Sequence, residues 1–171
     1  MGSNPAIPTT LSMAPPFKIL FVCTGNICRS PMAEAVLRHK VQESGLEGQI
    51  EVDGAGVAAY HVGENADPRT ISTLAKHGIA EPSLARQVRS SDFEEFDLIV
   101  AMDVGHLTAL SRLAGTARDK VILFNDFAPD ALPDEVPDPY YGPLSGFDEV
   151  YEIVDTGTEA FLTSWRARRL Q

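Results

Sequence analysis

The sequence is poor in cysteine and lacks any long apolar run. Among 171 residues there are two cysteines, Cys23 and Cys28, and both lie in one short segment. Small secreted domains that depend on disulfides are rich in cysteine and spread their pairs along the chain, so a reducing, cytoplasmic location is expected. No apolar stretch approaches the roughly 20 residues that span a bilayer, and the N-terminus lacks a signal-peptide layout. We therefore expect a soluble protein with no membrane partner.

Positive charge is also scarce. The chain has 14 Lys and Arg residues against 24 Asp and Glu residues, a formal net charge of −10. Proteins that bind nucleic acid or anionic lipid usually carry basic patches, so we expect neither as a partner. Any anionic ligand must then be bound by a local arrangement of donors rather than by overall charge.

Residue patterns for metal and nucleotide chemistry are missing as well. The four histidines do not stand at the spacings of a metal site, and we interpret them as structural or solvated residues. The Gly-x4-Gly-Lys-Ser/Thr pattern of P-loop nucleotide hydrolases is absent. We therefore expect no metal and no other cofactor. The histidines are His39, His61, His77 and His106.

The apolar pattern predicts one α/β domain. Residues 1–16 hold four prolines and little periodic apolar pattern, so we expect a disordered leader followed by a domain over 17–171. Apolar runs then alternate with amphipathic stretches, which is typical of a parallel sheet flanked by helices on both faces. Four strands of one open sheet are predicted, at 18–22, 50–53, 98–102 and 121–124. Helices are predicted after Ser30, after Asp67 as a helix cap, around 107–113, and from Ser145 onward. The last helix is expected to bury an apolar stripe of Phe147, Val150, Tyr151, Val154, Phe161, Leu162 and Trp165.

The first strand leads directly into a cysteine-containing loop at 23–30, which reads Cys-Thr-Gly-Asn-Ile-Cys-Arg-Ser. Ser30 is expected to cap the next helix, with Pro31 as its first residue, and another turn is expected at 54–56. In open α/β sheets, ligands bind outside the carboxyl ends of the strands, where the strand order reverses. This loop between strand 1 and helix 1 is therefore the candidate binding site.

The residue types in this loop suit phosphoryl transfer. Consecutive backbone N–H groups between a strand and a helix N-terminus can form an anion-binding nest. Arg29 can bind two phosphate oxygens through its planar guanidinium, and the positive field favours Cys23 as a thiolate nucleophile. Attack on phosphorus would give a phosphocysteine intermediate that water then hydrolyses. The expected phosphate-binding residues are Thr24, Gly25, Asn26, Ile27, Cys28, Arg29 and Ser30.

Simpler interpretations exist for these loop residues. Most Cys-x5-Arg pairs are a small buried residue and a surface charge, and only the position at a strand end before a helix favours function here. Ser30 could orient the thiolate, cap the helix, or do both. Cys28 is either a small packing residue or a thiol that resolves oxidised Cys23 by forming a reversible disulfide.

Phosphoryl transfer also requires a proton donor for the leaving oxygen. Asp138 begins the segment Asp-Pro-Tyr-Tyr-Gly and has proline on both sides, although an ordinary turn is the favoured interpretation of that segment taken alone. Asp103, at the end of the third strand, could hydrogen-bond beneath the phosphate loop or serve as a strand-end cap. Tyr60, Tyr140 and Tyr141 are predicted to bind substrate as aromatic walls of a deep cleft, with ordinary surface packing as the alternative.

Separated segments resemble the low-molecular-weight protein tyrosine phosphatase family from about Phe17 to Trp165. The resemblance implies a four-stranded parallel sheet flanked by helices and metal-independent hydrolysis of phosphotyrosine in proteins. The segments are 22–34, 61–63 with Asp67 and Arg69, 77–79, 85–87, 92–93, 96–97, 102–103 and 138–142.

The same resemblance assigns roles to four residues. It implies Cys23 as nucleophile, Arg29 as phosphate clamp and Asp138 as general acid, and it implies that Asn26 holds the loop through side-chain hydrogen bonds. Substrate preference is left open, because four positions depart from residues common in the family. They are Gly54, Tyr60, Leu84 and His106.

Two other functions compete with this interpretation. Arsenate reductases on the same fold use thiols further along the chain, and no cysteine follows Cys28. A phosphotyrosine-binding module without catalysis would need neither Cys23 nor Asp138. We therefore expect a monomeric phosphatase whose partners are phosphotyrosine-containing proteins.

Overall fold

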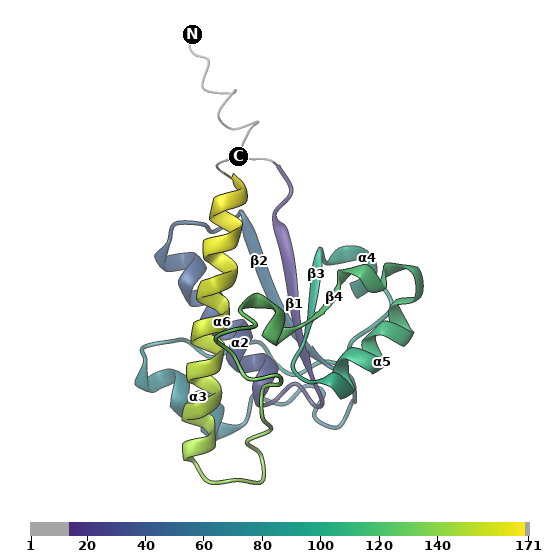
Figure 1. The fold of residues 1–171 in the computed structure, drawn as a ribbon. Coiled ribbons are helices and arrows are strands. Elements are labelled where there is room, and N and C mark those ends of the chain that lie inside the picture. The colour runs from purple at the N-terminus through teal and green to yellow at the C-terminus, as the bar shows by residue number, and fades with distance from the viewer. Residues whose placement is uncertain (1–13, 170–171) are drawn as a thin grey trace.

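The computed structural model describes residues 14–169 as a sheet enclosed by two layers of helices (Figure 1). Neighbouring strands all pair in parallel, in the order β2-β1-β3-β4. The predicted α/β class with four parallel strands is thus confirmed. Residues 1–13 of the expected leader lie outside the described residues, and its disorder stays a prediction. The strands are β1 Phe17–Cys23, β2 Ile50–Gly56, β3 Leu98–Ala101 and β4 Val121–Leu123.

Helices cover both faces of the sheet, as the sequence predicted. In Figure 1, α2, α3 and α6 lie on one side of the strands and α4 and α5 on the other. The helices are α2 Arg29–Glu43, α3 Pro68–Lys76, α4 Asp92–Glu95, α5 Val104–Ala114 and α6 Ser145–Arg169, with 3₁₀ helices η1 Gly115–Lys120 and η2 Phe124–Phe127.

The central strand β1 explains why the molecule has two cores. Its apolar residues alternate between the faces, because successive side chains of a strand point to opposite sides. Ile19 and Phe21 join the core beneath α2 and α6, whereas Leu20 and Val22 join the core beneath α4 and α5. All four are fully buried, as expected for a parallel strand covered on both faces. Burial on both faces holds β1 in place up to its end at Cys23, where the cysteine-containing loop starts.

The helix α6 packs along α2 through an apolar stripe (Figure 1). The predicted stripe is confirmed, since all its members are buried except Tyr151, which is half-buried and stacks on His77 with ring centroids 3.7 Å apart. The long helix therefore holds the segment before it, which carries Asp138, to the same side as α2. The buried members are Phe147, Val150, Val154, Phe161, Leu162 and Trp165.

Two local predictions were wrong. Ser30 is the second residue of α2 and does not cap it; Cys28 is the N-cap residue and makes no side-chain cap bond. The expected turn at 54–56 is instead the end of β2, because β1 continues to Cys23 and Gly56 pairs with it in register. A Cβ on Gly56 would lie 2.7 Å from the Thr24 carbonyl oxygen, so glycine permits the close approach of β2 to the loop.

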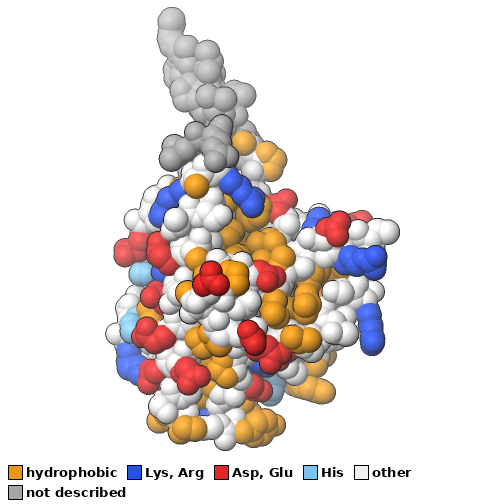
Figure 2. All heavy atoms as spheres, viewed as in Figure 1, with side chains coloured by type: hydrophobic (Ala, Val, Ile, Leu, Met, Phe, Trp, Pro, Cys, Tyr) orange, Lys and Arg blue, Asp and Glu red, His pale blue; other side chains and the backbone are white. Residues whose placement is uncertain are grey.

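Acidic residues outnumber basic ones, with 24 Asp and Glu against 14 Lys and Arg. On the face drawn in Figure 2, red acidic side chains are spread widely and no continuous basic patch interrupts them among the described residues. None of the helices in the part of the chain that the structure describes combines the length and apolarity needed to cross a membrane.

Candidate active site

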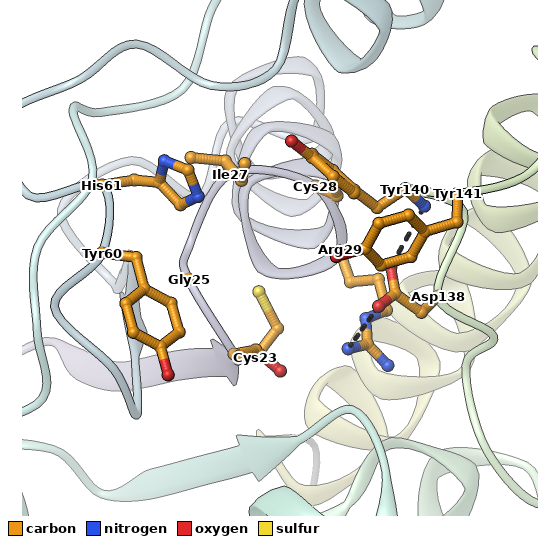
Figure 3. Close-up of a pocket in the computed structure, with 11 residues that line it drawn as sticks. Cys23, Gly25, Ile27, Cys28, Arg29, Tyr60, His61, Asp138, Tyr140 and Tyr141 are labelled. Atoms are coloured by element: carbon orange, nitrogen blue, oxygen red, sulfur yellow. Dashed lines mark hydrogen bonds and ion pairs between the residues drawn. The ribbon is translucent and has the colours of Figure 1, made fainter.

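A cavity of about 200 Å³ opens at the carboxyl end of β1. The chain leaves β1 for β2 on one side and later returns to β3 on the other, so this is the position where the strand order reverses. Of the predicted site residues, Asn26 and Ser30 do not line the cavity and lie beneath it. The lining residues are Cys23, Thr24, Gly25, Ile27, Cys28, Arg29, Tyr60, His61, Asp138, Tyr140 and Tyr141 (Figure 3).

The backbone of the loop is arranged as an anion nest. Its carbonyl groups are held by outside donors: the Cys23 carbonyl by Val57 N–H at 2.9 Å, and the Thr24 carbonyl by Ala58 N–H at 2.9 Å. In a planar trans peptide the N–H points opposite the C=O. The N–H groups of Thr24 and Gly25 therefore point away from these partners. Such N–H groups next to a helix N-terminus attract anions.

Asn26 sets the turn of the loop. Its φ of 58° lies in the left-handed region, which asparagine tolerates better than most residues. Its amide nitrogen donates to Ser30 Oγ at 2.7 Å, and its amide oxygen accepts from Arg86 N–H at 3.1 Å. The side-chain hydrogen bonds that the resemblance implied for Asn26 are therefore present.

Ser30 points at the candidate nucleophile. Its Oγ lies 3.0 Å from Cys23 Sγ and 3.4 Å from the Ala55 carbonyl oxygen. Ser30 Oγ accepts from Asn26, so its single proton can be donated either to the Ala55 carbonyl oxygen or to Cys23 Sγ. Cys23 is 3% exposed and immediately precedes the loop that leads into α2.

The second cysteine has the opposite environment. Burial, followed by the negative charge of Asp67, raises the pKa of the Cys28 thiol to about 12. Its Sγ lies 3.9 Å from Asp67 Oδ2. Cys28 is therefore a protonated thiol at neutral pH, which leaves Cys23 as the candidate nucleophile.

Arg29 is a buried cation fixed on two sides. It is 4% exposed, and its Nη1 donates to Asp103 Oδ2 at 3.0 Å and to the Val136 carbonyl at 3.1 Å. Its Nη2 lies 3.8 Å from Asp138 Oδ2. The guanidinium thus joins the phosphate loop to the segment that carries the expected acid, as the dashed line in Figure 3 shows.

Asp103 hydrogen-bonds to the loop, as one interpretation expected, and it caps the start of the helix α5 rather than the end of the strand. One carboxylate oxygen caps α5 by accepting from His106 N–H at 2.9 Å, and the other accepts from Arg29. Burial by itself would raise the pKa of Asp103, but the hydrogen bond from the His106 backbone, together with the hydrogen bond and positive charge of Arg29, holds that pKa below its usual value. Asp103 is therefore a carboxylate that fixes the guanidinium from below.

Asp138 is held much more loosely. Its side chain is 48% exposed, and its Oδ1 accepts from Tyr140 N–H at 3.1 Å. The predicted turn is thus present, and the same residue also borders the cavity. Arg69 anchors this segment by donating from Nη1 to the Tyr140 carbonyl at 3.1 Å, while Asp67 binds Arg69 at 2.8 Å.

Aromatic side chains stand on opposite sides of Cys23. Tyr60 lies on one side with His61, and Tyr140 and Tyr141 lie on the other (Figure 3). Tyr60 is 77% and Tyr141 91% exposed, so the walls are open to solvent above the loop. Their binding of substrate stays a prediction.

Two cavity-side residues were not predicted as site residues. His61 lines the cavity, and a Cβ on Gly25 would lie 2.9 Å from its ring, which explains a glycine there. His106 is buried and bonds through Nε2 to Thr24 Oγ1 at 2.8 Å. The sequence signal for His106 was its position three residues after Asp103. No group of metal-ligating side chains is present in residues 14–169.

Known proteins resemble this chain over most of its length. Residues 18–170 match the family model described as low molecular weight phosphotyrosine protein phosphatase. A low molecular weight protein-tyrosine-phosphatase of Streptomyces coelicolor is 49% identical over 154 residues, which is 88% of this chain and 94% of that protein. One from Schizosaccharomyces pombe is 47% identical, over 81% of this chain and 90% of its own. The crystal structure of a protein tyrosine phosphatase from Entamoeba histolytica superposes with a TM-score of 0.85 at 38% identity, over 90% of this chain and 99% of that one.

Proposed function

This chain belongs to the low molecular weight phosphotyrosine protein phosphatase family and is a hydrolase, and on that premise we propose that it hydrolyses phosphotyrosine in proteins through a phosphocysteine intermediate. Cys23 is the nucleophile, Arg29 is the phosphate clamp and Asp138 is the general acid. Thr24 to Ser30 bind the phosphate.

The observation that carries this proposal is the meeting of three side chains at one cavity. Cys23 and Arg29 come from the loop between β1 and α2, whereas Asp138 comes from a segment more than a hundred residues later. A binding site for phosphate needs the nest and the guanidinium only. A buried thiol beneath the cavity and a carboxyl group at its edge are the further groups that hydrolysis requires.

In the first step, the Cys23 thiolate attacks phosphorus while the bond to the tyrosyl oxygen breaks. Protonated Asp138 gives its proton to that oxygen, and tyrosine leaves. Negative charge on the phosphoryl oxygens is stabilised by the backbone N–H groups and by Arg29, which Asp103 and the Val136 carbonyl hold in place.

In the second step, a water molecule attacks phosphorus from the side that tyrosine has left. The phosphorus–sulfur bond breaks, inorganic phosphate forms, and the Asp138 carboxylate takes up the water proton, which restores the starting state. The hydroxyl proton of Ser30 stabilises the thiolate that leaves, since Ser30 Oγ is 3.0 Å from the sulfur.

Tyrosine preference follows from the position of the thiol. Cys23 is buried below the aromatic side chains of Tyr60, Tyr140 and Tyr141, which border the same cavity. A phosphotyrosine ring is long enough to place its phosphate in the loop while contacting these rings, whereas a phosphoserine backbone would have to enter the cavity itself.

The test is turnover of matched phosphotyrosine, phosphoserine and phosphothreonine peptides in the presence of a metal chelator. We expect release of phosphate from the phosphotyrosine peptide alone. Equal rates on all three peptides would refute the tyrosine preference, and loss of activity on chelation would refute the metal-independent mechanism.

We also propose that Cys28 protects Cys23 from irreversible oxidation. Peroxide oxidises the Cys23 thiolate by two electrons to a sulfenic acid. The Cys28 thiol, which is protonated at neutral pH, loses its proton as it attacks that sulfur; water leaves, and the disulfide that forms is reduced again by a cellular thiol. Both cysteines are free and border one cavity. After peroxide and then dithiothreitol, wild-type activity should recover largely and Cys28→Ser activity poorly; equal recovery would contradict this role.

Two broader expectations belong to the same proposal. The free state of both cysteines supports a reducing, cytoplasmic location. The protein acts as a monomer, and its substrates are phosphotyrosine-containing proteins. Sedimentation velocity over a range of concentrations tests the monomer, and localisation of the tagged full chain tests the compartment.

A further inference from the structure

A buried histidine contacts the phosphate loop, and the proposed mechanism does not use it. His106 lies in the first turn of α5, is 4% exposed, and its Nε2 is 2.8 Å from the hydroxyl oxygen of Thr24. Thr24 directly follows the nucleophile and lines the cavity. Among the described residues, His106 Nδ1 is the buried side-chain nitrogen or oxygen that has no hydrogen-bond partner.

The surroundings of Nδ1 decide which ring nitrogen carries the proton. Asp103 Oδ1 lies 3.1 Å from Nδ1, although the direction does not suit a hydrogen bond. A lone pair on Nδ1 would face the carboxylate with like charge at this distance, whereas an N–H would be attracted to it. The Nδ1–H tautomer is therefore the favoured one, and Nε2 is left as an acceptor.

An acceptor at Nε2 fixes the direction of the Thr24 hydroxyl. Thr24 must donate its only hydroxyl proton to His106, so its oxygen offers lone pairs alone to the cavity. It follows that the Thr24 hydroxyl does not donate to phosphate, and that Thr24 serves phosphate through its backbone N–H.

We propose that His106 is a positioning residue of the phosphate loop, which accepts the Thr24 hydroxyl proton and, with Asp103, ties the first residue after the nucleophile to the Arg29 guanidinium. The chain of contacts runs from Thr24 to His106, from His106 to Asp103 and from Asp103 to Arg29. These contacts therefore connect Thr24 and Arg29, near the two ends of the loop, to the N-terminus of α5. This inference rests on the proposed function.

The charge state of His106 is consistent with this role. Burial lowers the pKa of His106 to about 4, and the positive charge of Arg29 acts in the same direction. The carboxylates of Asp103, Asp138 and Glu135 also face it and act in the opposite direction without reversing the shift. The imidazole is thus neutral at neutral pH, as an acceptor at Nε2 requires.

The tautomer can be observed directly in the wild-type protein. Long-range ¹H–¹⁵N spectra distinguish a protonated from an unprotonated ring nitrogen, and the His106→Gln spectrum assigns the signal. We expect a neutral ring between pH 5 and pH 8 with the proton on Nδ1. A proton on Nε2, or a charged ring at pH 7, would overturn the inference whether or not the protein is a phosphatase.

Substitutions on both sides of the bond test its consequence. Thr24→Val removes the hydroxyl at constant shape, and His106→Leu removes the acceptor, whereas Thr24→Ser and His106→Gln retain a donor and an acceptor. We expect kcat/KM for a phosphotyrosine peptide to fall about 3- to 10-fold in Thr24→Val and in His106→Leu, the usual effect of one hydrogen bond. Thr24→Ser and His106→Gln should largely retain kcat/KM. The double variant Thr24→Val with His106→Leu should lose no more than either single one, because the residues act as a pair.

Binding of inorganic phosphate separates this inference from the proposed function. The affinity of each variant for inorganic phosphate, measured by titration, should decrease in the same order as kcat/KM. This measurement needs no turnover. If the wild type binds phosphate and the variants follow this order but no peptide is hydrolysed, the proposed function fails and the positioning role stands. His39→Gln, at a half-buried histidine of α2 remote from the cavity, is the matched control and should equal wild type. Multiplicative losses in the double variant, or no rescue by Thr24→Ser, would refute the role of His106.

Discussion

The phosphate loop and the segment that carries Asp138 border the same cavity but are held very differently. In the loop, Cys23, Asn26, Arg29 and Ser30 are all below 5% exposure, and each has a partner in another part of the fold or the loop. In the acid segment, Asp138 is half exposed and its hydrogen bonds are local, apart from its approach to Arg29 at 3.8 Å.

This difference matches the two tasks. In the proposed mechanism, the loop presents fixed donors to charge that develops on phosphorus, and prearranged donors stabilise a transition state best. In the same proposal, the acid lets a protein substrate enter and leave, which a segment fixed through Arg69 and the start of α6 permits. Substitutions in the loop should therefore affect nucleophilic attack and transition-state stabilisation. Substitutions around the acid segment should affect proton donation to the leaving group.

The most severe loss is expected at the nucleophile. Cys23→Ser should abolish turnover, because a serine hydroxyl in this place is a much weaker nucleophile, and it should still bind phosphotyrosine peptide through the nest and Arg29. Phosphate release and equilibrium peptide binding measure the two effects. Residual turnover near the wild-type rate would remove Cys23 from its role.

In the acid segment, the loss of activity on replacing Asp138 should depend on the leaving group of the substrate. Asp138→Ala should lower kcat by about 10²–10⁴-fold for phosphotyrosine, the usual contribution of a general acid. Aryl phosphates whose phenols are more acidic need less help from a proton donor, so the loss should shrink along a leaving-group series. An equal loss on every leaving group would mean that Asp138 positions the segment and does not donate a proton.

Arg29→Lys distinguishes charge from geometry in the loop. An ammonium cannot bind two phosphate oxygens and Asp103 in the planar arrangement of the guanidinium, so kcat/KM should fall by about 10²–10³-fold, as for loss of a transition-state donor. Urea unfolding of the same variant serves as the control for the fold. A variant with wild-type kcat/KM would show that charge alone suffices.

The support of the acid segment should matter less. Arg69→Met removes the bond to the Tyr140 carbonyl but keeps apolar contact with Phe147, whose ring centroid lies 4.5 Å from the guanidinium carbon. We expect a loss of about 3- to 10-fold in kcat for phosphotyrosine, in line with one hydrogen bond, with little change in phosphate binding. Lys76→Met, at an exposed ion pair on the same helix, is the matched control and should equal wild type.

The smallest effect concerns pH. The folded-state pKa of His106, about 4, lies below the usual histidine value of 6.5, so the unfolded chain binds more protons between these two pH values. This contribution to stability is complete above pH 6.5 and falls as the pH decreases, by at most about 1.4 kcal/mol per pH unit. The free energy of unfolding should therefore fall less steeply in His106→Gln than in wild type over this range. Identical slopes would contradict the burial of a neutral His106.

The sequence predicted the parts that depend on near neighbours. A continuous apolar run made β1, and an alternation of such runs with amphipathic stretches predicted parallel strands between helices, because burial on both faces demands apolar residues throughout. The loop residues from Cys23 to Arg29 were placed at the end of β1 for the same reason. Asp67 was correctly predicted as a helix cap, since its side chain bonds two residues ahead.

The predictions that failed depend on contacts between distant segments. Ser30 has the residue type of a cap, but Asn26 and Cys23 occupy its hydroxyl instead. The glycines at 54 and 56 have the residue type of a turn, but β1 extends far enough to keep them paired in β2. Local propensity is a weak preference, and pairing of a whole strand outweighs it.

What the sequence determined by itself was the fold class, the loop and the kinds of group available for phosphoryl transfer, because all three follow from residues close together in the chain. The tertiary structure alone decided that Asp138 reaches Arg29 and that His106 reaches Thr24 across 82 positions. It also decided that Cys28 stays a protonated thiol while Cys23 faces a hydroxyl donor, although both belong to one short loop. Hydrogen-bond partners and burial belong to three-dimensional neighbours, and periodicity along the chain carries no information about them.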